Sequence, residues 1–385
     1  MTLGAIAFGV AALIVSTGFV NDFLYQLREA TIHSQFGHLQ ISKAGYSTAG
    51  KRDPYEYMIE DADKRAAEIG QIGSIVEVLP RISFSGLLSN GRTTYPIIGE
   101  GIDPQKERKL SSYMRFSAGG ALPDKDKFTI IVGKGVASAL DLHVGDPVVM
   151  LLNTRGGALN SLDFRIGGIF QTFSKEFDER AVRIPLAAAQ ELLSTQAVHT
   201  LVLVLSDTQR TDEVAAILAA RLPKKDFEIK PWYELADFYQ KTVDLYQRYF
   251  YVLYAIILGL VLLGVANNLN MTIYERTGEF GTLMALGNRR WSVFRLILIE
   301  TLFLGMIGSV AGVVLGGGFA AVISAVGIPM PPMPNTNTGY TAYIRVVPLE
   351  VFRSLFIGLT GSLVAALWPA QKASQREIAE ALRHN

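Results

Sequence analysis

Residues 274–295 read YERTGEFGTLMALGNRRWSVFR and lie between two stretches that are almost purely apolar. Charged side chains in this segment alternate with apolar ones at intervals of three and four, a spacing that places each kind on one face of a helix. We therefore predict a short amphipathic helix over about residues 275–290 that joins two apolar segments.

The flanking segments are long enough to cross a membrane, which takes about 20 apolar residues in a helix. Two further segments of this kind occur in the chain. The 385 residues are 49% hydrophobic and only 18% charged, whereas soluble domains average about 25% charged residues. We predict four transmembrane helices, over residues 1–21, about 247–270, about 292–326 and about 349–369.

Residues 22–245 have an ordinary mixed composition and predict a folded domain outside the membrane. Two strand–helix–strand patterns, in halves of about 30–100 and 197–235, indicate an α+β layer, with Thr211 as the expected N-cap of the second helix. Strands separated by Gly, Asp and Asn turns predict a mainly β insertion over about 101–196. The predicted fold class is an α-helical membrane protein with four transmembrane helices plus a large extracytoplasmic α+β domain, built from βαβ halves.

The last three spans belong to a second region, residues 246–385. Basic residues gather in the quoted segment and in the tail 370–385, and the positive-inside rule places such loops in the cytoplasm. The N-terminus is then expected in the cytoplasm, with residues 22–245 and the loop 327–348 on the opposite side of the membrane.

Several kinds of chemistry are absent from the sequence. The net charge of +1 argues against a nucleic-acid partner, and the lack of cysteine excludes disulfides. Neither a G-x-x-x-x-G-K-[ST] phosphate loop nor an H-E-x-x-H zinc motif occurs. His33 and His38, five residues apart near a strand, are expected to face opposite sides and not to share a metal. We predict no enzyme activity, no cofactor and no metal site.

Two features of the third span suggest contacts with other helices. Glu300 is the one acid inside it; snorkelling, a helix-pair hydrogen bond and a proton or ion role are all open for it. Four glycines recur at intervals of three and four, a spacing that lets another helix approach closely. Their partner is either another span of this chain or a second copy. These predicted helix-packing residues are Gly305, Gly308, Gly312 and Gly316.

The amphipathic segment has three readings: a solvated turn, a helix lying on the membrane, or a helix inserted into a groove of a partner. We favour the third, because apolar anchors and charges both recur at helical spacing. The predicted contact residues are Glu275, Arg276, Glu279, Phe280, Leu283, Met284 and Gly287.

The same segment, extended to YERTGEFGTLMALGNRRWSVFRLILIE, resembles the coupling helix of bacterial ABC-transporter permeases of the FtsX/MacB family. That family's pattern reads E-R-x-x-E-[IF]-G-x-L-x-A-[LIM]-G, followed by basic residues and a new span. The tail WPAQKASQREIAEALRHN resembles the family's P-A-x-x-A-S-x-x-x-[IP]-x-E-A-L-R ending. The stretch REATIHSQFGHLQISKAGY is more similar to the lipoprotein-releasing (LolC/LolE-like) subgroup than to the macrolide exporters. Family members carry a basic amphipathic segment before the first span, whereas only Met1 and Thr2 precede Leu3 here, so we expect a truncated start or a missing segment.

The resemblance implies a MacB-like periplasmic core domain with porter-like βαβ halves at 22–245. It also implies an FtsX-like permease domain at 246–385 in the bacterial inner membrane. Its implied partners are a cytoplasmic ABC ATPase dimer, a second permease copy or paralogue, membrane lipids, and a periplasmic cargo or carrier such as a lipoprotein. ATP hydrolysis in the separate ATPase would move the coupling helix, and the spans would relay this movement to the periplasmic domain. The alternative is an FtsX-type regulator that activates a periplasmic cell-wall hydrolase.

Overall fold

The computed structural model describes residues 2–50, 52–110, 113–332 and 339–375. They form two compact units. The helical unit takes the described residues of Met1–Tyr25, Thr242–Met330 and Thr341–Asn385, and the α/β unit takes those of Gln26–Lys241 and Pro331–Tyr340. The family-like residues 380–383 of the predicted tail lie outside the described residues.

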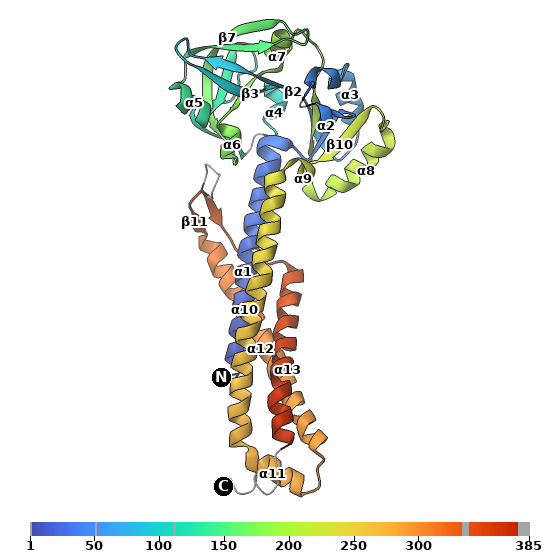
Figure 1. The fold of residues 1–385 in the computed structure, drawn as a ribbon, viewed down its shortest axis with the longest axis vertical. Coiled ribbons are helices and arrows are strands. Elements are labelled where there is room, and N and C mark those ends of the chain that lie inside the picture. The colour runs from blue at the N-terminus through green and yellow to red at the C-terminus, as the bar shows by residue number, and fades with distance from the viewer. Residues whose placement is uncertain (1, 51, 111–112, 333–338, 376–385) are drawn as a thin grey trace. The chain divides into compact units, whose positions relative to one another are not determined.

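Four long helices dominate the helical unit (Figure 1). Each is long and apolar enough to cross a membrane, and the four predicted spans lie within them, which confirms that part of the fold prediction. Their bounds are α1 (Thr2–Thr31), α10 (Asp237–Glu275), α12 (Arg290–Val326) and α13 (Pro348–Ser374).

Helices α1 and α10 extend well beyond the apolar segments that predicted them. Residues 19–36 contain no glycine or proline, so nothing local stops the helix when the sequence becomes polar. A π-helical turn, η1 (Ile32–Phe36), follows α1 directly, and the helix ends at Gly37, whose φ is +66°. Helix α10 likewise begins at Asp237, ahead of its apolar part.

Apolar side chains hold the long helices together. Ile6 and Val10 of α1 share one buried cluster with Val261 and Val265 of α10 and with Ala366 of α13. Three short elements complete the unit, namely α11 (Thr277–Ala285), β11 (Ile328–Met330) and β12 (Tyr340–Ala342).

The two predicted strand–helix–strand patterns interleave in one sheet. Strands lie in the order β10–β1–β9–β2, and each neighbouring pair is antiparallel. Each half therefore contributes alternate strands, the arrangement of a split βαβ motif. Thr211 is not the N-cap predicted for the second helix: Arg210 holds that position, and Thr211 is the first helical residue. The elements are β1 (Leu39–Lys43), α3 (Ala62–Ile69), β2 (Ile75–Ser89), β9 (Thr200–Leu205), α8 (Thr211–Arg221) and β10 (Phe227–Pro231).

Strands of the predicted β insertion (about 101–196) close into a ring together with β3 and the second half of β2, which lie before the predicted bounds. Pairing runs β2–β3–β8–β5–β7–β6 and returns to β2. Strand β2 is long enough to serve both parts: residues 75–81 pair with β9, and residues 82–89 pair with β3. The strands are β3 (Thr94–Ile102), β4 (Arg115–Gly119), β5 (Thr129–Gly133), β6 (Pro147–Asn153), β7 (Leu159–Gln171) and β8 (Ala181–Pro185).

Short helices cover the ring and its connections, and one apolar core runs through both parts of the α/β unit. They are α2 (Tyr46–Ala49), η2 (Pro54–Tyr57), α4 (Pro104–Glu107), α5 (Lys134–Leu140), α6 (Lys175–Asp178), α7 (Leu186–Leu193), η4 (Thr208–Arg210) and α9 (Trp232–Leu235).

Candidate functional site

The amphipathic segment forms helix α11, which lies where α10 and α12 meet (Figure 1). A single residue, Arg276, separates α10 from α11. At the other end Gly287 adopts φ +94°, and its N–H donates to the Met284 carbonyl at 3.1 Å. The Asn288 N–H donates to the Leu283 carbonyl at 3.2 Å. This pair of bonds is a glycine-dependent helix stop, so Gly287 sets the length of α11.

One face of α11 is buried against its own chain. Phe280 and Met284 are 4% and 6% exposed, and Leu283 packs beside them. The predicted docking into a partner needs these side chains to face the partner, whereas here they face their own membrane helices. Helical spacing identifies an apolar face but not what covers it. The residues that cover it, from α10, α12 and α13, are Ile273, Val293, Ile297, Ala370 and Ala373.

The opposite face of α11 is open. Leu286 is 78% exposed, and the nearby side chains of Glu275, Glu279 and Thr282 are also exposed. Leu286 follows Phe280 by six residues, which places it about 240° away around a helix with 3.6 residues per turn. The sequence prediction omitted Leu286 because it falls outside the apolar stripe. The feature of the sequence that could have identified Leu286 is an apolar residue on the charged side of the helix, directly before Gly287.

Arg276 ties α11 to α12. Its Nε donates to Glu279 Oε2 at 2.8 Å, and its Nη1 donates to both carboxylate oxygens of Glu300, at 3.0 and 2.9 Å. The guanidinium also lies 5.3 Å from the centre of the Phe280 ring. Hydrogen bonding to Glu279 raises the pKa of Arg276. Glu300 therefore has a cationic partner in the N-terminal part of α12, and we call Arg276, Glu279 and Glu300 the Arg276 bridge.

The predicted helix-packing glycines contact helices of the same chain. A Cβ placed on Gly312 would lie 2.6 Å from Val10 Cβ, and one on Gly308 would lie 3.0 Å from Ile6 Cβ, both on α1. A Cβ on Gly316 would also meet α1, 3.0 Å from the Ala11 Cα. Gly305 instead faces Ser362 of α13. The stripe thus brings α12 close to both α1 and α13.

An apolar cavity of about 540 Å³ opens in the helical unit, between residues of α1, α10 and α12 and the segment after β12. A volume of this size is typical of sites for small ligands. Its lining contains almost no polar surface and includes Phe19, Tyr249, Phe250, Ile256 and Ile344.

The prediction that His33 and His38 face opposite sides is wrong. Their ring centres lie 5.3 Å apart, because His33 belongs to the π-helical turn η1 rather than to a strand, and the turn at Gly37 brings His38 back against it. Burial, with a smaller contribution from His33, lowers the pKa of His38 to about 4. Among the residues that the structure describes, no three His, Asp or Glu side chains are grouped so as to hold a metal ion.

Comparisons with known proteins agree with this architecture. Residues 1–221 match the model of the MacB-like periplasmic core domain, and residues 251–378 match that of the FtsX-like permease C-terminal region. A lipoprotein-releasing system transmembrane protein LolC from Neisseria meningitidis is 24% identical, over 100% of this chain and 93% of its own length. A macrolide export ATP-binding/permease protein MacB from Hyphomonas neptunium is 26% identical, over 82% of this chain and 48% of its own length. The crystal structure of the periplasmic region of MacB from Actinobacillus actinomycetemcomitans covers 54% of this chain and 93% of its own, at 17% identity and a TM-score of 0.39.

Proposed function

Because the chain belongs to the family of ABC-transporter permeases that combine a MacB-like periplasmic core domain with an FtsX-like permease region, we propose that it is a mechanical relay. Cytoplasmic ATP hydrolysis would be converted into movement of a periplasmic domain that releases or exports a lipoprotein or another hydrophobic cargo. Four apolar helices and a periplasmic-type domain fit an inner-membrane protein. We propose that both termini and α11 lie in the cytoplasm and the α/β unit in the periplasm.

The two-faced packing of α11 is the observation that carries this proposal. Its outer face presents Leu286 together with the exposed Glu279, and Glu275, the last residue of α10, is exposed as well. This mixture of an apolar anchor with charges suits a protein partner. Its inner face packs on α12 and α13 through Phe280 and Met284. In the proposed relay the outer face binds the ATPase, and the inner face passes a displacement to the membrane helices. Phe280, Leu283 and Met284 then position α11 instead of contacting the partner.

The partner on that face is proposed to be a separate ABC ATPase dimer. The sequence contains no phosphate-binding loop, and such a loop is what binds the nucleotide phosphates in these ATPases. Two ATPase subunits need two permeases, so a second copy of this chain or a paralogue is proposed as well.

The cargo is proposed to be a lipoprotein. The LolC relative matches along the whole chain, and the cavity bordered by Phe19, Phe250 and Ile344 is apolar enough to take an acyl chain. A hydrophobic drug is the proposed alternative occupant, on the basis of the MacB relative.

A single substitution on the outer face tests the ATPase contact. Leu286→Asp places a charge in the proposed apolar contact and should weaken ATPase binding by at least tenfold, about 1.4 kcal/mol. Because Leu286 is exposed, the thermal midpoint of the detergent-solubilised chain should not change. Co-purification with the ATPase and ATPase stimulation in nanodiscs would measure the effect.

The matched control is Leu159→Asp. Leu159 is 72% exposed in the α/β unit, so it offers the same chemical change at a site away from α11. Wild-type ATPase binding by Leu286→Asp would contradict the proposed contact. ATP-driven release of lipoprotein from proteoliposomes supports transport, whereas activation of a cell-wall hydrolase without release supports the regulator alternative.

A further inference from the structure

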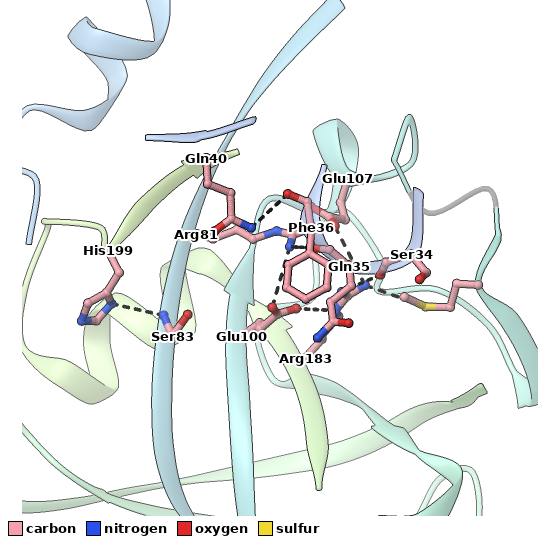
Figure 2. A network of polar contacts seen from close by, with 11 residues as sticks. Ser34, Gln35, Phe36, Gln40, Arg81, Ser83, Glu100, Glu107, Arg183 and His199 are labelled. Carbon is pink, nitrogen blue, oxygen red and sulfur yellow. Dashed lines mark hydrogen bonds and ion pairs between the residues drawn. The ribbon is translucent and has the colours of Figure 1, made fainter. Parts of the chain in front are cut away.

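Three buried charged side chains and one partly buried one, all in the α/β unit, surround the end of the helix that continues α1 (Figure 2). Arg81 comes from β2, Glu100 from β3, Glu107 from α4 and Arg183 from β8. Arg183 is 0% exposed, Arg81 2% and Glu107 3%. We call these four residues the helix-end cluster. Their sequence context does not single them out, because each arginine sits in a strand, where a charged residue normally faces water.

The four charges balance one another. Arg183 Nε lies 2.8 Å from Glu100 Oε2, and Arg81 Nη2 donates to Glu107 Oε1. The cross pairs are longer: Arg81–Glu100 is 3.7 Å and Arg183–Glu107 is 3.9 Å. Burial tends to raise the pKa of Glu100, but the two arginines lower it below its ordinary value. Each carboxylate is thus shared by two guanidinium groups from different elements.

Both arginines also bind the helix itself. Arg81 Nη1 donates to the carbonyl of Gln35, and Arg183 Nη2 donates to the carbonyl of Ser34 at 3.1 Å. These carbonyls belong to η1, the turn that follows α1 without a break. The last carbonyls of a helix have no partner within it and carry its negative end. Two cations held by strands β2 and β8 therefore cap the helix and fix its position.

Ionic contacts at this place are not explained by stability alone. The surroundings are apolar: the Phe170 and Phe177 rings lie 5.9 Å from the Arg183 guanidinium, and the Met114 sulfur lies 4.0 Å from Arg183 Nη1. Buried ion pairs are often no better for stability than apolar residues of the same volume. The charges instead fix the geometry of the contact, because a guanidinium binds carbonyls and carboxylates only at defined positions.

The cluster also has an unused hydrogen bond. Arg81 Nε and Glu107 Oε2 are buried and have no partner among the described residues. They belong to two side chains that already form one bond, so a rotation into a bidentate pair would satisfy both atoms.

We propose that the helix-end cluster is the joint through which displacement of α1 is passed to strands β2, β3 and β8. Arg81 and Arg183 are positioning residues in this role. The proposal rests on the relay function above, since it supplies the output contact of the relay. A rigid grip on η1 moves the ring of strands with the helix, whereas loss of the grip lets the helix move without them.

The double variant Arg81→Met, Glu107→Leu tests the joint in the complete complex with its ATPase, reconstituted in liposomes. It removes one ion pair as a unit, so the fold is retained while the hold on Gln35 is lost. We expect an ATPase rate within twofold of wild type and at least a tenfold fall in ATP-driven lipoprotein release. The control, Arg210→Met with Glu213→Leu, removes an exposed pair at the start of α8 and should release cargo at the wild-type rate.

Full release by a folded double variant would overturn the joint. Arg81→Lys supplies a second test, because it keeps the positive charge but loses the planar guanidinium that donates to two acceptors at once. Release at the wild-type rate would again count against the proposal. Hydrogen exchange in the wild-type complex covers the case in which neither variant folds. Because the grip is rigid, ATP should change or preserve protection in residues 32–36 and in β2 together, and a change in residues 32–36 alone would overturn the joint. A wild-type complex that neither binds an ATPase nor releases cargo would instead overturn the relay function itself.

Discussion

The two arginine clusters of this molecule do similar work under opposite conditions. In the Arg276 bridge, the side chains of Arg276 and Glu300 are 33% and 43% exposed. In the helix-end cluster, Arg183 is fully buried and Glu100 is 15% exposed. Exposed ion pairs contribute about 0–1 kcal/mol, whereas removing one partner of a buried pair costs about 3–5 kcal/mol. The Arg276 bridge can therefore rearrange at little cost in free energy, whereas the helix-end cluster is a fixed attachment.

This difference suits a relay with an adjustable input and a rigid output. In the proposed relay a partner binds at α11, pushes it and withdraws, so the contact between α11 and α12 would gain from a weak, solvated bridge. At the end of α1, a loose contact would let the helix move without moving the strands. The contrast yields predictions that differ in size and in kind.

The largest effect is expected at the buried cluster. Arg183→Met leaves the largely enclosed Glu100 without its nearest cation, so the free energy of unfolding should fall by about 3–5 kcal/mol. Denaturant titration of the purified full-length chain, followed by Trp232 fluorescence with Trp291 and Trp368 replaced, would measure it. Arg210→Met, at a fully exposed pair, should leave the same quantity nearly unchanged, because solvent screens the pair. An equal response of the two variants would remove the distinction between the clusters.

A steric contact of the helical unit is expected to give an intermediate effect. Gly312→Ala puts a methyl group 2.6 Å from Val10 Cβ and 2.7 Å from the Ala7 carbonyl, and overpacking of this kind costs about 1–3 kcal/mol. Gly317 lies in the same helix with open space around it, so Gly317→Ala should be neutral or stabilising. Thermal midpoints in detergent would compare the pair. If both variants lowered the thermal midpoint equally, helix propensity and not contact with α1 would determine the loss of stability.

Some of this architecture follows from local sequence patterns and some does not. The spans and the two strand–helix–strand patterns were predictable, because hydropathy and strand alternation are properties of neighbouring residues. Closure of the ring was not, since the pairing of β2 with β6 joins residues 87–89 to 149–151, which have no local signature. Local sequence patterns also did not indicate which surface covers a given side chain. Phe280 packs on its own helices and Arg183 lies under the end of η1, yet both occupy ordinary positions in their own elements.

The smallest effect on stability is expected at the Arg276 bridge. Glu300→Gln removes the charge but keeps the shape, and the free energy of unfolding should change by no more than about 1 kcal/mol because both partners are partly exposed. The effect on coupling should be larger. With Arg276 bound only to Glu279, α11 loses its ionic tie to α12, and the permease-stimulated ATPase rate should fall several-fold.

Salt provides an independent check on the same bridge. Screening weakens exposed pairs far more than buried ones, so raising the ionic strength from 0.05 to 0.5 M should reduce ATPase stimulation in the wild type but not in Glu300→Gln. Arg353→Gln is the matched control, because it removes an exposed pair with Glu350 that does not touch α11. If salt and Glu300→Gln reduced stimulation additively, the salt effect would lie elsewhere, for example in the contact between the ATPase and the exposed acids of α11. The bridge would then be a static tie like the buried cluster, and the contrast between an adjustable input and a fixed output would fail.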